Sequence, residues 1–478
     1  MATLDFTKFY NVIDGKLVGT AKTRRAVNPS TEEELWEVPV STQEDIDKAV
    51  AAAKKAQEAW AEVSWEDRRK AIHNFAAALE KQSGEFAKLL TTEQGKPLMF
   101  AQGEIAEAVR WLRTLSSYPE PQETVEESPE RKVSIRYTPL GVAVGIVPWN
   151  FPVQLASGKI AAALVTGNAF ILKPSPFTPY CDLKMAELAQ AFFPPGIFQA
   201  LSGDDNLGPW LTAHPGIDKV SFTGSTATGK RVMESCAKTL KRVTLELGGN
   251  DPAIVCADAD PAVVGPKVAT MALFNSGQIC IAVKRVYVHE SIYPAVLAAM
   301  VEFVKSVRVG DGHSEGVFMG PVNNKLQFDR VKNLLDDIEK TQLKIATGST
   351  KTQADGSKGL FITPTIIDNP PEDSRIVVEE PFGPVFPVLK WTDEADVIKR
   401  ANDTDMGLGA SVWSQNMETA HRIAKKLKAG NVWINAHAEP QPEAPFGGHK
   451  HSGVGYEWGE GGLKAYCNAQ SVYVKTSP

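Results

Sequence analysis

Residues 142–175 read VAVGIVPWNFPVQLASGKIAAALVTGNAFILKPS, and their pattern decides the fold. The segment contains an apolar run, a helical stretch, a Gly-Asn turn and a second apolar run, at residues 142–147, 156–165, 167–168 and 169–172. A strand, a helix and a strand in this order predict one βαβ unit of a parallel sheet. Because nucleotide-binding α/β sheets hold ligands at the carboxyl ends of such strands, we expect a site at that edge.

The same alternation continues along the chain. A second unit is predicted with its strand at 219–223, its turn at 224–229 and its helix at 230–239, and further strands are predicted at 252–255, 286–289, 363–367 and 385–389. A second α/β domain is expected to begin near Asn250, whereas the first 110 or so residues are expected to be mainly helical. The alternating segments 132–137 and 471–475 read as strands, the latter as an edge strand that pairs within the chain or across a subunit interface.

Composition and charge exclude several classes of protein. The chain has 478 residues, 43% of them apolar and 23% charged, which is typical of a folded protein of two or three domains. A net charge of −6 favours neither a nucleic acid nor a membrane partner. The longest smooth apolar run, 141–148, is far shorter than the roughly 20 residues that span a bilayer, so a cytoplasmic protein is expected. Five cysteines without a CxxC pair indicate neither a disulfide framework nor a zinc site.

Cys280 ends the segment FNSGQIC at 274–280, after a glycine-containing turn and before an apolar strand. A buried free cysteine commonly packs as a small hydrophobe, whereas one exposed in such a turn can become a thiolate. Both interpretations stay open from this segment alone.

Glu246 and Asn150 also stand out. Glu246 interrupts an apolar strand in TLELGG at 244–249, where a carboxylate costs stability unless it is paired or its pKa rises. A raised pKa suits a general base; the alternative is a solvent-facing Glu on an edge strand. Asn150, in PWNFP at 148–152, follows a predicted strand and either donates to a developing oxyanion or simply forms a turn.

Two other motifs indicate less. GSTATGK at 224–230 nearly matches a P-loop, but Arg231 stands where Ser or Thr would hold magnesium, so an NTPase is not favoured. A turn of small and hydroxyl residues before a helix can still bind a pyrophosphate. His449 and His451 lie in a glycine-rich loop without carboxylate or cysteine neighbours, so we expect surface residues and no metal.

Taken together, the segments resemble the aldehyde dehydrogenase superfamily, in the family's order and over nearly the whole chain. The motifs are PWNFP at 148–152, KPS at 173–175, FTGS at 222–225, ELGG at 246–249, GQIC at 277–280, EEPFGPV at 379–385 and PFGGHKHSG at 445–453. Glu246 precedes Cys280 by 34 residues, which also matches the family.

The resemblance implies an α/β fold with two Rossmann-like domains and a small β oligomerisation element. It assigns residues 1–121 and 140–248 to a cofactor-binding domain and residues 249–450 to a catalytic domain. Residues 122–139 and 451–478 would form the oligomerisation element and the C-terminal tail, and a homodimer or homotetramer is expected.

The resemblance also implies roles for individual residues. Cys280 would attack the aldehyde, Asn150 and the Cys280 amide would hold the oxyanion, Glu246 would activate the hydrolytic water, and Lys159 would support the site. NAD or NADP would be bound by Ile146, Pro148, Trp149, Lys173, Ser175, Gly224, Ser225, Leu247, Glu380 and Phe382. The aldehyde would be lined by Phe151, Leu155, Gly158, Ile279, Ile281 and Phe446.

Two residues depart from the pattern of many relatives. Pro176 stands where NAD-preferring members carry a Glu that binds both ribose hydroxyls, so we expect relaxed or NADP-tolerant cofactor use, with Lys173 and Ser175 available to a 2′-phosphate. Gly158 stands where acetaldehyde-type members often carry a large aromatic, so more room and a bulky or aromatic aldehyde are expected. The rival hypotheses are a CoA-acylating dehydrogenase, a cysteine-dependent esterase without a redox role, and a non-catalytic protein on this fold.

Overall fold

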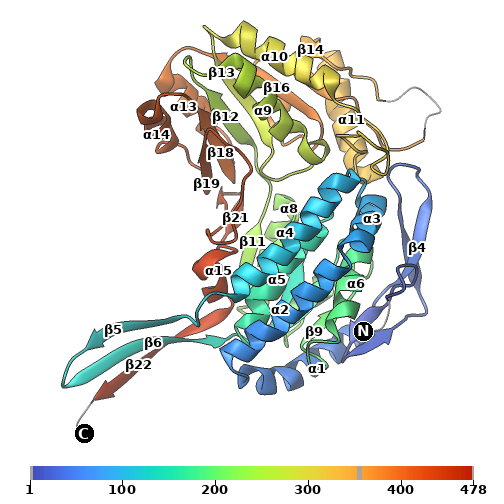
Figure 1. Cartoon of the computed structure of the whole chain (residues 1–478), viewed down its shortest axis with the longest axis vertical. Coiled ribbons are helices and arrows are strands. Elements are labelled where there is room, and N and C mark those ends of the chain that lie inside the picture. Colours follow the sequence, from blue (N-terminus) through green and yellow to red (C-terminus); the bar gives the residue numbers. More distant parts are fainter. Residues whose placement is uncertain (1–3, 353–357, 476–478) are drawn as a thin grey trace.

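The computed structural model describes residues 4–352 and 358–475 and shows an α/β chain built on two large sheets (Figure 1). The first sheet has the strand order β2-β1-β9-β8-β7-β10-β11-β21. Its strands are β1 (Asn11–Ile13), β2 (Lys16–Val18), β7 (Val142–Ile146), β8 (Ala169–Lys173), β9 (Phe198–Ala200), β10 (Lys219–Thr223), β11 (Arg242–Glu246) and β21 (Gly453–Val454). The five strands from β9 to β11 are parallel, and the outer strands pair antiparallel.

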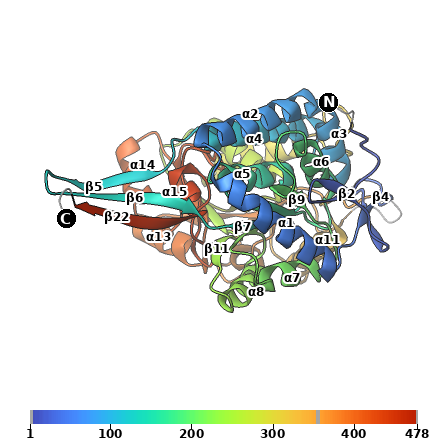
Figure 2. The same ribbon diagram turned by 90° about the horizontal axis from the view of Figure 1, so that it is seen from below.

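Helices cover both faces of this sheet. They are α1 (Gln43–Ala61), α2 (Trp65–Lys81), α3 (Ser83–Gln94), α4 (Leu98–Ser116), α5 (Pro152–Val165), α6 (Tyr180–Ala189), α7 (Leu207–Ala213) and α8 (Thr226–Ala237). Figure 2 shows α2, α4, α5 and α6 on one side, and α7 and α8 on the other. The predicted βαβ units are confirmed, but both helices begin earlier than expected. Pro152 occupies the first turn of α5, and the Ser225 side chain caps α8.

The expectation of a mainly helical start is wrong for residues 11–39. Besides β1 and β2, this stretch forms the hairpin of β3 (Thr23–Val27) and β4 (Glu34–Pro39). Strands of three residues are too short to show a period of two, although the Asp14-Gly15 turn that closes the β1-β2 hairpin is a local signal. The pairing of Val12 with Ala200 then joins this hairpin to the sheet. The helices α1 to α4 follow only after it, and for that part of the chain the expectation is confirmed.

The second sheet has the order β14-β15-β16-β13-β12-β18-β19 and is parallel except for β14. Its strands are β12 (Asp251–Val255), β13 (Val283–His289), β14 (Ile345–Thr347), β15 (Thr365–Asp368), β16 (Val385–Trp391), β18 (Gly409–Trp413) and β19 (Asn431–Ile434). Separate apolar clusters bury its two faces, against α9 (Pro261–Leu273), α10 (Tyr293–Ser306), α11 (Lys325–Lys340), α12 (Arg375–Val378), α13 (Glu394–Asn402) and α14 (Met417–Ala424). The predicted α/β fold with two Rossmann-like sheets is therefore confirmed.

A three-stranded antiparallel arm projects from the body (Figures 1 and 2). It consists of β5 (Gln122–Glu127), β6 (Arg131–Pro139) and β22 (Cys467–Lys475), with β22 paired along the whole of β6. The predicted C-terminal strand thus pairs within the chain. Not all of residues 451–475, which were expected in the oligomerisation element and tail, belong to this arm. Strand β21 joins the first sheet beside β11, and α15 (Gly459–Lys464) lies between β21 and β22. Within residues 4–352 and 358–475, no helix is long and apolar enough to cross a membrane.

Candidate active site

A cleft of about 710 Å³ opens at the carboxyl ends of β7, β10 and β11, where it also meets segments of the second sheet. Of the residues singled out in the sequence, ten line it, namely Pro148, Trp149, Asn150, Leu155, Gly224, Ser225, Leu247, Cys280, Glu380 and Phe382. They come from both sheets, so the fold brings the nucleophile and the predicted dinucleotide residues to one place. This is the edge at which open α/β sheets bind ligands.

Cys280 sits on a strained turn between α9 and β13. The 3-10 segment Phe274–Gly277 contains two non-glycine residues in the left-handed region, Asn275 at φ 51° and Ser276 at φ 59°. Such strain persists only where neighbours hold it. Ser276 Oγ donates to the Gly320 carbonyl at 2.8 Å, and Gln278 Nε2 donates to the Asn275 carbonyl at 2.9 Å. The turn leaves Cys280 partly exposed to the cleft, whereas Cys181, Cys236, Cys256 and Cys467 are buried.

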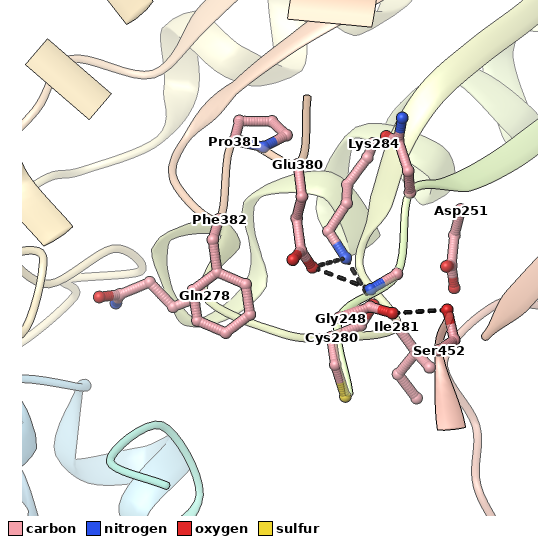
Figure 3. Close-up of polar contacts among 12 residues, drawn as sticks. Gly248, Asp251, Gln278, Cys280, Ile281, Lys284, Glu380, Pro381, Phe382 and Ser452 are labelled. Atoms are coloured by element: carbon pink, nitrogen blue, oxygen red, sulfur yellow. Dashed lines mark hydrogen bonds and ion pairs between the residues drawn. The ribbon is translucent and has the colours of Figure 1, made fainter. Parts of the chain in front are cut away.

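The backbone of Cys280 lies against the ELGG turn. A Cβ on Gly249 would lie 2.6 Å from the Cys280 carbonyl oxygen, so only glycine permits this approach. The Gly249 amide donates to Glu380 Oε1 at 3.1 Å, and the Lys284 ammonium lies 3.0 Å from the same oxygen (Figure 3). Lys284 also donates to the Cys280 carbonyl. Sequence reasoning missed Lys284, which reads as an ordinary charge at the start of a strand.

Burial raises the pKa of the Cys280 thiol to about 12, and Lys284 is the neighbour that opposes the rise. Asp251, Glu380 and Glu246 add to it through their negative charges. The thiol is therefore neutral at pH 7 in this arrangement. To react as a thiolate, it needs a proton acceptor or a further positive charge beside it.

Glu246 ends β11, and its side chain is buried rather than facing solvent. Burial raises the pKa of this carboxyl well above its usual range, with a further rise from Glu457 and an opposing effect of Lys159. Neither carboxyl oxygen has a hydrogen-bond partner among the described residues. A buried carboxyl of raised pKa can take up a proton near neutral pH, which is the property that a general base requires.

Lys159 and Glu457 form a buried ion pair beside Glu246, with Nζ and Oε1 3.1 Å apart. Lys159 Nζ also donates to Ser221 Oγ at 2.8 Å, and Ser221 in turn donates to Glu457. Lys159 was singled out in the sequence, but Glu457 was not, because it stands in a glycine-rich loop with no periodic pattern. Only the return of β21 to the first sheet brings Glu457 to this place.

Asn150 follows β7 and faces the nucleophile loop. Its Nδ2 donates to the Gln278 carbonyl at 2.9 Å, which uses one of its two N–H groups. The backbone carbonyl of Asn150 accepts from Lys96 Nζ at 2.8 Å, and Lys96 is paired with Glu104 in the core. Glu104 Oε1 accepts from the Val153 amide at 3.0 Å, at the first turn of α5. A buried ion pair thus fixes both Asn150 and the helix that carries Lys159.

The residues around the cleft fit a dinucleotide. Gly224 and Ser225 precede α8, whose amino-terminal N–H groups are suited to a pyrophosphate. Glu380 offers a carboxylate to ribose hydroxyls. The rings of Trp149 and Phe382 meet edge to face at 5.4 Å, and Gln327 Nε2 donates to the Phe382 carbonyl at 3.1 Å.

Three predicted dinucleotide residues lie outside the lining of the cleft. Ile146 is buried at the end of β7. Lys173 donates to its neighbouring Pro174 carbonyl, and Ser175 Oγ accepts from the Phe177 amide at 3.2 Å. Burial, together with the positive charge of nearby Arg24, lowers the pKa of Lys173 to about 8.

Gly158 does not enlarge the pocket in the way the sequence led us to expect. A Cβ at this position would lie 2.6 Å from Trp458 Nε1 and 3.3 Å from the Trp111 ring. The indole of Trp458 therefore occupies the place that an aromatic side chain at 158 would take. Trp458 in turn packs on Phe446, with ring centroids 4.6 Å apart.

The other predicted pocket residues belong to the apolar core of the first sheet. Ile279, Ile281 and Phe446 are buried in this core, Phe151 and Leu155 are partly buried against it, and Leu155 lines the cleft together with Cys280. Phe151 stacks on Phe274 at 6.5 Å.

The remaining sequence motifs have other places. The near P-loop 224–230 runs into α8, with Lys230 exposed on the helix. His449 and His451 are exposed, as expected of surface residues.

Two Rossmann-like sheets with a cysteine in the cleft and a buried glutamate at the end of β11 fit a nicotinamide-dependent dehydrogenase. The family model for the Aldehyde dehydrogenase family matches residues 18–472. Aldehyde dehydrogenase LUC3 of Fusarium sp is 42% identical over 471 residues, which cover 98% of this chain and 100% of that protein. This chain belongs to the aldehyde dehydrogenase family and is an NAD(P)-dependent aldehyde dehydrogenase.

Solved structures agree with this assignment. The NAD+ complex of an aldehyde dehydrogenase from Bacillus cereus superposes with a TM-score of 0.95 at 38% identity, covering 98% of this chain and 97% of that one. An Escherichia coli enzyme described as NADP dependent has a TM-score of 0.95 at 32% identity, covering 98% of each chain. The neighbours therefore include both NAD- and NADP-linked proteins.

Proposed function

We propose that the enzyme oxidises an apolar, bulky or aromatic aldehyde to its carboxylic acid by acyl transfer through Cys280. The observation that carries the proposal is the placement of Cys280 on a strained turn facing the cleft, with Asn150 beside it. Overall, one aldehyde, one water and one oxidised dinucleotide give one acid, one reduced dinucleotide and one proton.

In the first half of the reaction, the Cys280 thiol gives up its proton to solvent water, and the resulting thiolate attacks the carbonyl carbon and forms a thiohemiacetal. The free N–H of the Asn150 amide and the Cys280 backbone amide donate to the developing oxyanion. The chemistry that a bound nicotinamide dinucleotide supplies is acceptance of the hydride from this carbon. Loss of the hydride leaves a thioester on Cys280, which keeps the acyl group bound for the second half.

In the second half, Glu246 removes a proton from a water that attacks the thioester, and the Cys280 sulfur leaves. The buried, unpartnered carboxyl of Glu246 supports this role. It also argues against the CoA-acylating alternative, which needs no such base. A cysteine-dependent esterase would leave Glu380, Phe382 and the α8 terminus without a ligand.

We further propose relaxed cofactor use. Pro176 supplies no carboxylate that would repel a 2′-phosphate, and Arg24 brings a second positive charge near Lys173. The negative charges of Asp205 and Asp182 act in the opposite direction and raise the pKa of Lys173. NADP is therefore expected to compete with NAD rather than to replace it.

For the substrate, the proposal rests on the apolar cluster and not on empty space at Gly158. Phe151, Phe274 and Phe446 offer ring faces and edges that suit an aromatic aldehyde. The Lys96 ammonium lies over the Phe151 ring and is paired with Glu104. A dicarboxylic semialdehyde therefore has no free partner among these residues.

We propose that the first sheet and its helices form the cofactor-binding domain and that the second forms the catalytic domain. The β5-β6-β22 arm would be the contact of a cytoplasmic homodimer or homotetramer. Val125, Tyr473 and Val474 are exposed on it.

A substrate panel tests the reaction. Benzaldehyde, acetaldehyde and succinic semialdehyde would be offered with NAD and NADP, with and without CoA, and the products identified by mass spectrometry. We expect free benzoate and a higher kcat/KM for benzaldehyde than for acetaldehyde. Formation of a CoA thioester, or ester hydrolysis without dinucleotide reduction, would overturn the proposal.

A further inference from the structure

Lys284 lies behind the nucleophile loop and has no role in the steps above. It is the second residue of β13, and only 2% of its side chain is exposed. Burial of an ammonium is costly unless it is paired and hydrogen-bonded. Both conditions are met, because Nζ donates to the Cys280 carbonyl and lies 3.0 Å from Glu380 Oε1 (Figure 3).

Glu380 is held from two sides. Its Oε1 accepts from the Gly249 amide at 3.1 Å and pairs with Lys284, while the residue lines the cleft. A Cβ on Gly248 would lie 2.4 Å from Glu380 Oε2, so the glycine leaves room for this carboxylate. The ELGG turn and β13 together fix its direction.

Three acidic side chains and one basic side chain affect the pKa of the Cys280 thiol. Asp251, Glu380 and Glu246 raise the pKa of the thiol, and Lys284 lowers it. Asp251 is buried, and burial raises the pKa of its carboxyl to about 7. Lys284 is thus the positive charge that counteracts them.

The other basic groups nearby are engaged or neutral. Arg285 is turned away and donates to the backbone carbonyls of Asn250, Arg400 and Ala401. His437 Nε2 lies 3.9 Å from Asp251, but burial lowers its pKa to about 3, so it carries no charge at neutral pH.

We propose that Lys284 is a positioning residue that links the dinucleotide site to the nucleophile, because it orients Glu380 towards the cleft and keeps a positive charge beside Cys280. The inference rests on the proposed roles of those two residues. Ribose hydroxyls that donate to Glu380 would share its negative charge and leave more of the Lys284 charge to stabilise the thiolate. Dinucleotide binding and thiolate formation would then favour each other.

Two measurements on the full-length enzyme test this without turnover. The first is the rate constant of Cys280 alkylation by iodoacetamide between pH 7 and 9, followed by mass spectrometry of the Cys280 peptide. The second is the dissociation constant of NAD and of NADP, from quenching of tryptophan fluorescence. The variants are Lys284→Met, Lys284→Arg and Glu380→Gln, with Lys305→Met as a control on an exposed lysine.

We expect Lys284→Met to slow alkylation at pH 8 about three- to tenfold, because loss of a nearby opposite charge raises a pKa by about one unit while nucleophilicity rises in part. Glu380→Gln should speed alkylation, and both variants should weaken dinucleotide binding about tenfold or more. Lys284→Arg should keep the alkylation rate within about threefold of the wild type, and Lys305→Met should change neither quantity. If the Lys284–Glu380 ion pair were merely structural, Lys284→Met and Glu380→Gln would not change the rate of Cys280 alkylation in opposite directions.

Unchanged alkylation and unchanged dinucleotide binding in folded Lys284→Met would overturn the inference. If that variant does not fold, Glu380→Gln decides, because an unchanged or slower alkylation there contradicts the charge coupling. Failure of the proposed reaction would look different, since the wild type would then form no reduced dinucleotide from aldehydes while these shifts persisted.

Discussion

The Lys159 ammonium lies 3.1 Å from Glu457 Oε1, and 2% and 4% of the two side chains are exposed. The pair connects α5 to the loop between β21 and α15, and it sets the charge around Glu246. Glu457 raises the pKa of the Glu246 carboxyl, and Lys159 opposes that rise. The ionisation of Glu246, the proposed base, therefore depends on this buried pair.

Glu457→Gln should move the pH profile of deacylation. Removal of the negative charge lowers the pKa of Glu246, so its ionised form, which is the active base, is present at lower pH. The rising limb of kcat against pH is expected to shift to lower pH. The variant also leaves Lys159 without its ionic partner, at a cost of about 3 kcal/mol in the free energy of unfolding. A pH–rate profile and urea denaturation check the two effects, and an unmoved limb in a folded variant would refute the electrostatic link.

Glu246→Gln should separate the two half-reactions. Acylation needs no ionised Glu246, so stopped-flow mixing is expected to show one equivalent of reduced dinucleotide per site. Steady-state turnover should then fall about 10²- to 10⁴-fold, because the water lacks its base. Glu234→Gln, on the exposed face of α8, is the matched control. A steady-state rate close to that of the wild type would assign the base elsewhere.

Lys96→Met should weaken catalysis through Asn150. Lys96 Nζ holds the backbone carbonyl of Asn150 at 2.8 Å, so its loss loosens the backbone that positions the Nδ2 group proposed to donate to the oxyanion. We expect kcat/KM to fall about tenfold or more, against about 10²- to 10³-fold for Asn150→Ala. The double variant should be no worse than Asn150→Ala, since both act on one amide. If the losses in kcat/KM of the two single variants multiplied in the double variant, Lys96 would not act through Asn150.

Gly158→Ala should destabilise the protein, because the new Cβ would lie 2.6 Å from Trp458 Nε1. Overpacking of this kind costs about 1–3 kcal/mol. In the Trp458→Leu background the same substitution should cost far less, and urea denaturation of the four proteins measures the coupling. Equal costs in the two backgrounds would show that Trp458 does not occupy this space.

NADP binding should depend on pH more strongly than NAD binding. Burial, with the positive charge of Arg24, holds the pKa of Lys173 down at about 8. The ammonium that would contact a 2′-phosphate is therefore present below this pH and lost above it. The dissociation constant of NADP is expected to rise between pH 7.5 and 9 while that of NAD stays nearly level. A parallel course of the two constants would exclude Lys173 from phosphate recognition.

Local patterns in the sequence predict those helices and strands whose apolar periodicity or turn residues lie within the element itself. The apolar runs and the Gly-Asn turn of 142–175 predict β7, α5 and β8, and the motifs lead to Cys280, Glu246 and Asn150. The partners of these residues have no comparable signal. Glu457, Trp458 and Lys284 act through contacts that tertiary folding creates, between segments far apart along the chain. The start of α5 was misplaced for a similar reason, since Glu104 from α4 caps it, whereas the cap of α8 is the adjacent Ser225.

The most direct test of the account is reduction of NAD or NADP by an aldehyde in the wild type and in Cys280→Ala, measured as absorbance of the reduced dinucleotide at saturating benzaldehyde. Circular dichroism and dinucleotide binding would establish that the variant keeps its fold and its cofactor site. We predict that Cys280→Ala forms no reduced dinucleotide above background while it still binds the cofactor. Undiminished reduction in Cys280→Ala would contradict the central claim that the reaction proceeds through this thiol.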